Sequence, residues 1–319
     1  MVAIFVNLSA NNGVAKGKWN SLEPLLRDTN LFNPKIITYT PPFDLASCIA
    51  ELIKKNKTAI FIAAGGDGSL NFLLNALISV DKENIEKYTI GGIGLGSSND
   101  FFKPFKFLNK VPLRVSVKNS RKHDIGRVKF TDASGVSRER FFLNNASIGL
   151  LANANHAFNQ GDLILNFLKR KYILAAIQYT AIKTLISHRP ILITLEYNNE
   201  QRSVKINNLS VVKNPYVSGE YKYNQDIQQD DRLLGLNYIR DADILDILKI
   251  MSDMEKERFI RSDGKGMAKR ESHFVESLKI IHENFIHLET DGEVIMAKDI
   301  SFDLYSRQIS VCGHGWDDK

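Results

Sequence analysis

The sequence predicts two domains, an α/β domain with a parallel sheet and a second domain rich in antiparallel β-strands. Its 319 residues exceed what one ordinary hydrophobic core contains. Up to about Pro112, short apolar runs alternate with segments of helical spacing, the pattern of a parallel sheet covered by helices. After Pro112, short runs of alternating polarity follow one another, which is typical of antiparallel β-structure, and we expect a sandwich.

The first part of the chain contains strand candidates that are short apolar runs. Between them lie segments whose apolar residues recur at i, i+3, i+4 and i+7, as on one face of a helix. Ser69 stands where the N-cap of the third such helix is expected. The expected strands are Val2–Val6, Lys35–Tyr39, Ala59–Ala64 and Tyr88–Ile93. The expected helices are one of which Leu22–Arg27 is a part, with Pro24 in its first turn, Leu45–Lys54, and Leu70–Ile78 after the N-cap at Ser69.

The second part reads mostly as β-strands separated by polar or turn-rich pieces. The expected strands are Arg114–Val117, Gly126–Phe130, Arg140–Asn144, Ile191–Tyr197, Ser203–Val212, Leu233–Ile239, Ser277–His282, Phe285–Glu289 and Ile300–Cys312. Two helices interrupt them, at about Asp162–Ser187 and Ala242–Arg261. No flexible linker separates the halves, so we expect them to pack closely.

Charge and cysteine content narrow the classes of partner and compartment. The net charge of +6 is modest and fits an anionic substrate or an acidic membrane surface. The sequence has no long basic block and no basic stripe with interleaved aromatic residues, so we expect no nucleic-acid partner. Cys48 and Cys312 lie far apart and outside any metal-ligand spacing, which indicates reduced thiols in a cytoplasmic protein.

The apolar segments favour a protein that touches a membrane at most peripherally. The N-terminus lacks the basic and apolar regions of a secretion signal. The longest apolar-leaning stretch, Tyr172–Ile186, is too short and too polar to span a bilayer. Lys169–Lys171 precedes it and is either a solvated helix end or a lipid-facing basic patch.

The stretch Gly65-Gly66-Asp67-Gly68-Ser69 is the first candidate site, because a strand turns there through glycines into a helix. Such a turn leaves backbone N–H groups pointing at one spot, and that spot attracts phosphate. A carboxylate from Asp67 inside this cradle suggests phosphate chemistry assisted by a metal ion. The alternative is a tight turn with an incidental Asp. The patterns G-x-x-x-x-G-K-[ST] and G-x-G-x-x-G are both absent.

Gly94–Asp100 forms a second loop of similar composition after the next strand. Gly96 lets the backbone approach a ligand closely, and Ser97 and Ser98 offer hydroxyl groups to a phosphate or a ribose. Its alternative is a polar loop that caps the next segment. Ligands of parallel sheets bind at the carboxyl ends of the strands, where both loops are expected.

Carboxylates provide the remaining candidates. Asp291-Gly292-Glu293 is either a D-G hairpin turn or a carboxylate pair that takes a proton from an alcohol acceptor. Asp230-Asp231 and Asp124 are either solvated turn residues or Mg²⁺ ligands. The histidines show no metal-ligand spacing.

Five motifs together resemble the diacylglycerol kinase catalytic-domain family: GGDGSLN at Gly65–Asn71, GLGSSNDF at Gly94–Phe101, NNASIG at Asn144–Gly149, QDDRLL at Gln229–Leu234 and DGE at Asp291–Glu293. The resemblance implies a nucleotide-binding α/β domain of the NAD kinase-like type, residues 1–120 with 299–319. It implies a β-rich lipid-substrate domain, residues 121–298, with the active site in the cleft between the two.

The resemblance also assigns roles to individual residues. It implies that ATP is bound by Thr40, Gly65, Gly66, Asp67, Gly68, Ser69, Asn71, Gly96, Ser97, Asn99 and Asp100. It places the catalytic carboxylates at Asp291 and Glu293 without choosing between them as the base, and gives Asp67 the placement of metal or phosphates. It implies a structural Mg²⁺ held by Gln228, Asp231 and Leu233, with Asp124 as a further metal candidate.

The expected activity is therefore that of an ATP- and Mg²⁺-dependent kinase acting on a hydroxyl of diacylglycerol or a related lipid alcohol, with a homodimer left open. Phe72 stands where the family has a glutamate, and Arg232 replaces the glycine of the metal loop. The family's N-P-x-S-G is altered at Asn7–Asn11. The alternatives are a soluble NAD kinase-like enzyme, because the first motif is shared, and a non-catalytic binder of nucleotide or lipid on the same fold.

Overall fold

The computed structural model describes residues 1–26, 34–160, 164–165, 167–168, 172–261, 264 and 267–317, which form two compact units. Unit 1 comprises Met1–Ile125 with Ser306–Lys319, and unit 2 comprises Gly126–Tyr305. The strands β7 (Ser116–Asp132) and β18 (Glu293–Gly313) each contain one of the two boundaries. From the sequence we expect a nucleotide-binding domain of residues 1–120 with 299–319 and a lipid-substrate domain of residues 121–298. These two functional assignments stay predictions.

Unit 1 is built on a sheet whose central strands run parallel. Its order is β2, β1, β3, β4, with the last part of β18 parallel to β4 and β6 antiparallel to β4. The strands are β1 (Val2–Asn7), β2 (Lys35–Tyr39), β3 (Ile60–Gly65), β4 (Thr89–Gly94), β5 (Phe107–Leu108) and β6 (Val111–Arg114). All four central strands therefore end at the same edge of the sheet.

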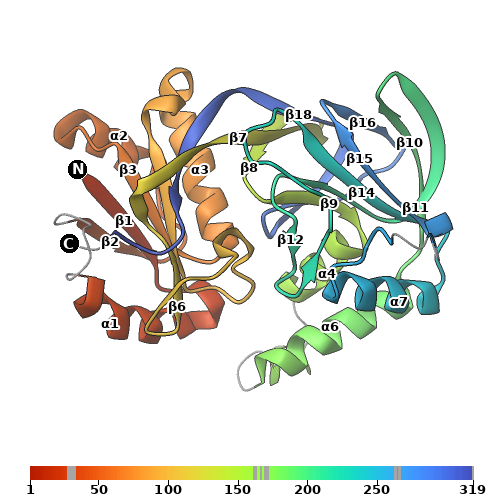
Figure 1. The fold of residues 1–319 in the computed structure, drawn as a ribbon, viewed down its shortest axis with the longest axis horizontal. Helices are drawn as coiled ribbons and strands as arrows, with labels where there is room; N and C mark the ends of the chain where they lie inside the picture. The colour runs from red at the N-terminus through yellow and green to blue at the C-terminus, as the bar shows by residue number, and fades with distance from the viewer. Residues whose placement is uncertain are drawn as a thin grey trace. The chain divides into compact units, whose positions relative to one another are not determined.

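Helices cover both faces of this sheet (Figure 1). On one face, Trp19 and Leu22 of α1 (Val14–Leu26) pack with Ile4 of β1 in one apolar cluster. Side chains alternate between faces along a strand, so Phe5 of β1 points to the other face. There α2 (Leu45–Asn56) and α3 (Asp67–Asp81) pack against each other, and α3 packs on β3.

The N-terminal ends of two helices in unit 1 differ from the prediction. Helix α1 begins at Val14 and not at Leu22, so Pro24 lies near its C-terminal end. Helix α3 begins at Asp67 with Gly66 as its N-cap, and Ser69 is not the N-cap. The extended backbone of Gly66 already turns the chain into the helix, which leaves the Ser69 hydroxyl available to a partner outside it.

Unit 2 is rich in strands that pair antiparallel. Its order is β15, β14, β11, β10, β16, β18, while β9 pairs with β11 and β17, β17 with β18, and β7 with β8. The strands are β8 (Ser137–Phe142), β9 (Asn145–Gly149), β10 (Ile191–Tyr197), β11 (Glu200–Val212), β12 (Tyr216–Val217), β13 (Tyr221–Lys222), β14 (Leu234–Arg240), β15 (Arg270–Val275), β16 (Leu278–Ile281) and β17 (Ile286–Thr290).

The α-helices of unit 2 whose bounds lie in the described residues are α4 (Leu150–Gln160), α6 (Ile173–Ser187) and α7 (Ile244–Glu255). Figure 1 shows them on one side of the unit 2 strands. Helix α7 starts with a capping box, in which the side chains of Asp243 and Asp246 each accept from the other's backbone N–H. Short 3₁₀ helices lie at Ala10–Gly13, Lys82–Lys87, Asp100–Phe102 and Met267–Lys269.

The helical insertion of unit 2 begins earlier than predicted, at Leu150, while Asp162 and Lys169–Lys171 lie outside the described residues. Helix α7 ends at Glu255, before the predicted Arg261. The strand β15 is absent from the prediction. Within the described part of the chain, none of the helices is long and apolar enough to cross a membrane.

Candidate active site

The two glycine loops predicted from the sequence are neighbours in unit 1. We call Gly65–Ser69 the first glycine loop and Gly94–Asp100 the second glycine loop. Gly65 ends β3, Gly94 ends β4, and these two residues are paired in the parallel register. The loops therefore leave the sheet side by side at its carboxyl edge, where ligands of parallel sheets bind.

Backbone contact between the loops requires glycine at position 96 and leaves little room for a side chain at position 66. A Cβ on Gly96 would lie 2.5 Å from the Cα of Gly66, a distance that real Cβ atoms do not reach. The backbone N–H groups of Leu95 and Gly96 donate to the carbonyl of Gly65 at 2.8 and 3.2 Å. The glycines therefore serve first to lock the loops together, which positions their backbone groups as one surface.

Asp67 ties the two loops together from its place in the first turn of α3. Its carboxylate accepts hydrogen bonds from the backbone N–H groups of Asp100 at 3.1 Å and Phe101 at 2.9 Å. In a simple phosphate-binding loop, the negative charge of Asp67 would repel the ligand. Here the Asp67 carboxylate faces the backbone N–H groups of Asp100 and Phe101 instead. Asp100 in turn accepts from Lys103 Nζ at 2.9 Å, a pair whose side chains are nearly buried.

Asn99 shapes the second glycine loop from within. Its backbone is left-handed, with φ +56°, and its side chain accepts from the N–H of Gly96 and donates to the Gly96 carbonyl, each at 3.2 Å. The side chain of Asn99 therefore holds the loop closed. Ser97 is exposed at the loop tip, where its hydroxyl is accessible to a ligand.

The remaining predicted nucleotide contacts of unit 1 lie at the same edge or just behind it. Ser69 Oγ accepts from the amide of Asn7, the last residue of β1, at 3.1 Å. Thr40 is exposed and directly follows β2. Asn71 is buried in α3, and its side-chain oxygen accepts from the amide of Asn75 at 3.1 Å. Asn7 is a site residue that was noted only as part of an altered motif.

In unit 2, Asp291 and Gly292 form a two-residue turn between β17 and β18. Both have positive φ, +46° and +96°, and Thr290 pairs with Glu293 across the hairpin. The Asp291 carboxylate accepts from three backbone N–H groups at 3.0–3.1 Å, those of Leu143, Asn144 and Asn145. This carboxylate is buried and aimed into its own chain, so it holds the turn in place.

Glu293 differs from Asp291, since its side chain is exposed at the first residue of β18. Arg140 lies close enough that the Glu293 charge raises the pKa of its guanidinium, although burial lowers that pKa by more. Glu289, a buried residue that sequence reasoning missed, accepts from the Ser147 hydroxyl at 2.6 Å and from the backbone N–H of Gly292. Of the two predicted carboxylates, Glu293 is the one exposed to solvent.

Comparison with known proteins bears on these observations. Residues 1–129, which contain both glycine loops, match the family model described as the diacylglycerol kinase catalytic domain. This segment belongs to the diacylglycerol kinase catalytic-domain family. The family model ends before Asp291 and Glu293, so the roles of those two residues stay predictions.

Two curated relatives extend the similarity beyond that segment. The chain is 26% identical over 251 residues to a proposed lipid kinase of Staphylococcus carnosus, covering 75% of this chain and 74% of that protein. It is 25% identical over 197 residues to a diacylglycerol kinase of Bacillus subtilis, covering 60% of this chain and 58% of that protein.

A solved structure shares the fold over nearly the whole chain. A crystal structure of a proposed diacylglycerol kinase from Bacillus anthracis covers 98% of this chain and 96% of its own, with a TM-score of 0.69 and 18% identity. At that identity the likeness concerns the fold.

The metal loop that the diacylglycerol kinase resemblance implies does not fit a metal ion here. The carbonyls of Gln228 and Leu233 and the carboxylate of Asp231 all accept from the ammonium of Lys213, at 2.7, 2.8 and 2.8 Å. Because one cation already occupies the centre of this oxygen set, the predicted Mg²⁺ at Gln228, Asp231 and Leu233 is corrected to an internal lysine contact. Arg232 points elsewhere, to the carbonyl of Tyr305 at 3.0 Å.

Asp124, the further metal candidate, lies fully buried in β7 and belongs to unit 1. Its carboxylate accepts from the amide of Gln308 at 2.9 Å. Across the described part of the chain, no group of three His, Cys, Asp or Glu side chains is placed to hold a metal ion. The role of Asp124 as a metal ligand stays a prediction.

Lys213 is a further candidate residue that sequence reasoning missed. A signal was present, because the lysine follows the apolar run Leu209–Val212 at the end of a strand. A cation at the end of a buried strand requires a nearby carboxylate or carbonyl partner.

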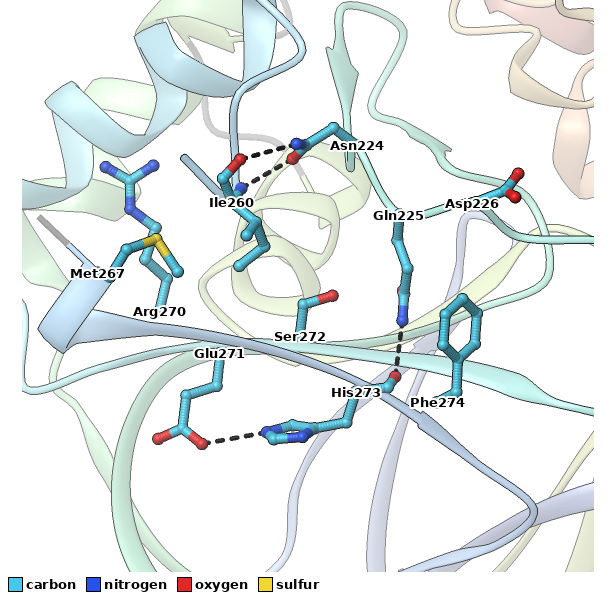
Figure 2. Close-up of a pocket in the computed structure, with 10 residues that line it drawn as sticks. All are labelled: Asn224, Gln225, Asp226, Ile260, Met267, Arg270, Glu271, Ser272, His273 and Phe274. Carbon is cyan, nitrogen blue, oxygen red and sulfur yellow. Dashed lines mark hydrogen bonds and ion pairs between the residues drawn. The ribbon is translucent and has the colours of Figure 1, made fainter. Parts of the chain in front are cut away.

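An open hollow of about 500 Å³ in unit 2 is lined by residues of β15 and of the segment after β13 (Figure 2). Its charged and polar groups engage one another: Glu271 accepts from Tyr238 at 2.6 Å and from Arg202 at 2.7 Å. Gln225 donates to the carbonyl of His273 at 2.7 Å. These hydrogen bonds satisfy the polar groups around the hollow within unit 2.

Proposed function

We propose that the protein is an ATP-dependent lipid kinase that transfers the γ-phosphoryl group of ATP to a hydroxyl of diacylglycerol or a related lipid alcohol. The observation that carries the proposal is the locked pair of glycine loops at the carboxyl edge of the parallel sheet, inside the segment that belongs to a kinase family. Such an edge presents backbone N–H groups and a helix N-terminus to an anionic ligand.

The phosphates of ATP would lie against the first turn of α3 and the two glycine loops. The first turn of α3 presents backbone N–H groups to a phosphate, and the packed Gly66 and Gly96 hold the second glycine loop beside that turn. The exposed Ser97 and Thr40 would add hydroxyl donors. Asp67 acts as a positioning residue, because its carboxylate holds the backbone of Asp100 and Phe101.

Mg²⁺ would enter this site bound to ATP, since the described residues hold no three-ligand group of their own. When bound, the ion would neutralise charge on the phosphates. The tasks that remain for the protein are to orient the phosphates and to accept the proton of the acceptor.

Glu293 is the base in this proposal. The acceptor alcohol gives its proton to the Glu293 carboxylate as its oxygen bonds to the γ-phosphorus, and the bond to the β-phosphate oxygen breaks to release ADP. Asp291 cannot accept this proton without disturbing three backbone hydrogen bonds, whereas the exposed Glu293 can. Asp291 therefore positions the turn from which Glu293 emerges.

A membrane-facing surface would give access to a lipid acceptor. On α7, Leu245 is 76% exposed, and Leu248 beside it is also exposed. On α6, Ile186 is 64% exposed, and Leu185 of the same helix packs against the apolar cluster that contains the buried side of α7. Exposed apolar residues on adjacent helices are typical of surfaces that bind protein or membrane, and the lipid substrate favours a membrane.

Phosphate transfer from labelled ATP, measured over a panel of lipid alcohols in detergent micelles, tests the proposal. We expect transfer to at least one lipid and a loss of turnover of roughly 100-fold or more in Glu293→Gln, with unchanged ATP binding. Transfer to NAD in place of a lipid would identify an NAD kinase-like enzyme and overturn the proposal. ATP binding without transfer to either class of acceptor would overturn it in favour of a non-catalytic binder.

A further inference from the structure

The oxygen atoms around Lys213 form a cation site whose cation is part of the chain. Lys213 directly follows β11, and its side chain is 0% exposed. Its ammonium donates to the carbonyls of Gln228 and Leu233 and to Oδ1 of Asp231, all at 2.7–2.8 Å. These are the distances of charge-assisted N⁺–H···O hydrogen bonds.

The same oxygen set cannot hold a divalent ion while the lysine is in place. Mg²⁺ needs oxygens at about 2.0–2.1 Å in near-octahedral geometry. An ammonium has three donors, and in this structure three oxygens receive them. An ion at the centre of these oxygens would have to displace a positive charge that is itself buried.

The loop geometry agrees with a cation at this position. Asp231 Oδ1 also accepts from the backbone N–H of Leu233 at 3.0 Å, which folds Asp231–Leu233 around the ammonium. Arg232, between them, has φ +62°, a conformation that favours glycine. The loop therefore keeps the backbone turn of a glycine-containing metal loop although its cation is a side chain.

We propose that the Lys213 ammonium has taken the place of the structural divalent cation in this loop, so that unit 2 is held together here without a metal ion. The inference is independent of the proposed kinase activity, because it concerns a structural contact.

The fixed ammonium also connects this loop to the turn that carries Glu293. The backbone N–H of Lys213 donates to the carbonyl of Asn144 at 2.7 Å. The backbone N–H of Asn144 in turn donates to the Asp291 carboxylate at 3.1 Å. A lysine anchored at both its backbone and its ammonium therefore links the residue 228–233 loop, the strand end at Asn144 and the Asp291 turn.

Thermal unfolding of the wild-type protein gives the first test, with EDTA and with excess Mg²⁺ in the absence of nucleotide. We expect the same Tm under both conditions and less than one equivalent of Mg²⁺ retained after dialysis. A Tm that rises with Mg²⁺ by several degrees, or one tightly held equivalent of Mg²⁺ per chain, would overturn the proposal without any variant.

Substitution of the lysine gives the second test. We expect Lys213→Met to lower Tm by roughly 6–20 °C, because it leaves the partly buried Asp231 carboxylate and two carbonyl groups without their cation. Lys205→Met, an exposed lysine on the same strand, is the control and should change Tm by no more than about 2 °C. Equal Tm values for Lys213→Met and the wild type would contradict a structural role for the ammonium.

A third variant asks whether the oxygens form a divalent-ion site once the ammonium is gone. Lys213→Ala should regain Tm when Mg²⁺ or Mn²⁺ is added, and the double variant Lys213→Ala/Asp231→Asn should not. Asp230→Asn, the exposed neighbour of Asp231, should leave the recovery intact. If Lys213→Ala shows no response to either ion, the oxygen set is not a divalent-ion site and the substitution proposal fails.

Discussion

Asp67 accepts a hydrogen bond from the backbone N–H of Asp100 at 3.1 Å, so a carboxylate of one glycine loop fixes the backbone of the other. Together with the hydrogen bond from the Phe101 N–H, this contact makes the proposed nucleotide-binding surface depend on both loops. In the sequence, the negative charge of Asp67 suggests repulsion of a phosphate. In the structure, Asp67 connects two segments that are 33 residues apart.

Removal of this tie should weaken nucleotide binding and stability together. We expect Asp67→Ala to lower the free energy of unfolding by about 1–3 kcal/mol, because two backbone donors lose their acceptor. ATP affinity should fall roughly tenfold or more. Urea denaturation and ATP titration measure the two effects. Glu83→Gln, an exposed carboxylate of unit 1, is the control, and ATP affinity that is equal in both variants would count against the tie.

The contact between Gly66 and Gly96 predicts that alanine at position 96 lowers stability, whereas alanine at a glycine with no close neighbour does not. Gly96→Ala would bring a Cβ within 2.5 Å of the Gly66 backbone, so we expect a loss of about 1–3 kcal/mol in stability and much weaker ATP binding. Gly17→Ala is the matched control, since no atom lies within 4 Å of its added Cβ in helix α1. That variant should gain about 0.5–1 kcal/mol. Equal stabilities of the two variants would refute the locked-loop description.

Local sequence patterns were sufficient to predict the strands and turns around the glycine loops. Continuous apolar runs and glycine turns depend on neighbouring residues alone, and β2 and β10 have the predicted ends. The sequence predicts the N-cap of α3 at Ser69, because serine is a favoured N-cap residue, whereas the extended backbone of Gly66 caps the helix in the structure. The sequence predicts the start of α1 at Leu22 and not at Val14, because Gly13, Gly17 and Pro24 are poor helix formers and interrupt the apolar spacing.

Long-range contacts explain the parts of the site that the sequence did not predict. Lys213 contacts Asp231, which is 18 residues away in the sequence. Lysines are normally exposed, and the strand before Lys213 indicates where the lysine lies but does not identify this partner. Asp291 and Glu293 are two residues apart with the same chemistry, and only the placement of Leu143–Asn145 separates their roles. The proposal that Glu293 is the base therefore rests on the hydrogen bonds that already engage Asp291.

The different surroundings of Asp291 and Glu293 predict that substitutions at these two residues have different effects on stability. Asp291→Asn should lower stability by about 1–3 kcal/mol, because an amide cannot accept all three backbone N–H groups. Glu293→Gln should change stability by no more than about 0.5 kcal/mol, as is usual for an exposed position. Urea denaturation of both variants makes the comparison. A large destabilisation by Glu293→Gln with none from Asp291→Asn would reverse the assignment.

A pair of stacked histidines should make unit 2 less stable in mild acid. The rings of His156 on α4 and His287 on β17 lie 4.0 Å apart, and His287 Nδ1 donates to the Asn153 side chain at 2.7 Å. Burial, and then the neighbouring His156, lower the pKa of His287 from 6.5. As pH falls below 6.5, the unfolded chain takes up a proton that the folded chain resists, so stability present above this pH declines.

Thermal unfolding from about pH 7.5 to about pH 5.5 measures this effect. We expect His287→Asn to flatten the decline in Tm, because it removes the titrating ring and leaves an amide in its place. His282→Gln, in the loop between β16 and β17, should keep the wild-type slope. A steeper slope in His287→Asn than in the wild type would show that the pair does not act in this direction.

The exposed leucines of α7 predict how the protein reaches a lipid surface. Leu245 and Leu248 lie one turn apart on α7, next to the exposed Lys249, an arrangement suited to insertion into an anionic membrane surface. We expect Leu245→Ser/Leu248→Ser to reduce sedimentation with phosphatidylglycerol vesicles by about tenfold or more, because two apolar side chains no longer enter the bilayer. Turnover on a short-chain acceptor in solution should be unchanged. Leu192→Ser, an exposed leucine of β10, is the control. Vesicle binding that is equal in the double variant and the control would exclude α7 as the membrane contact.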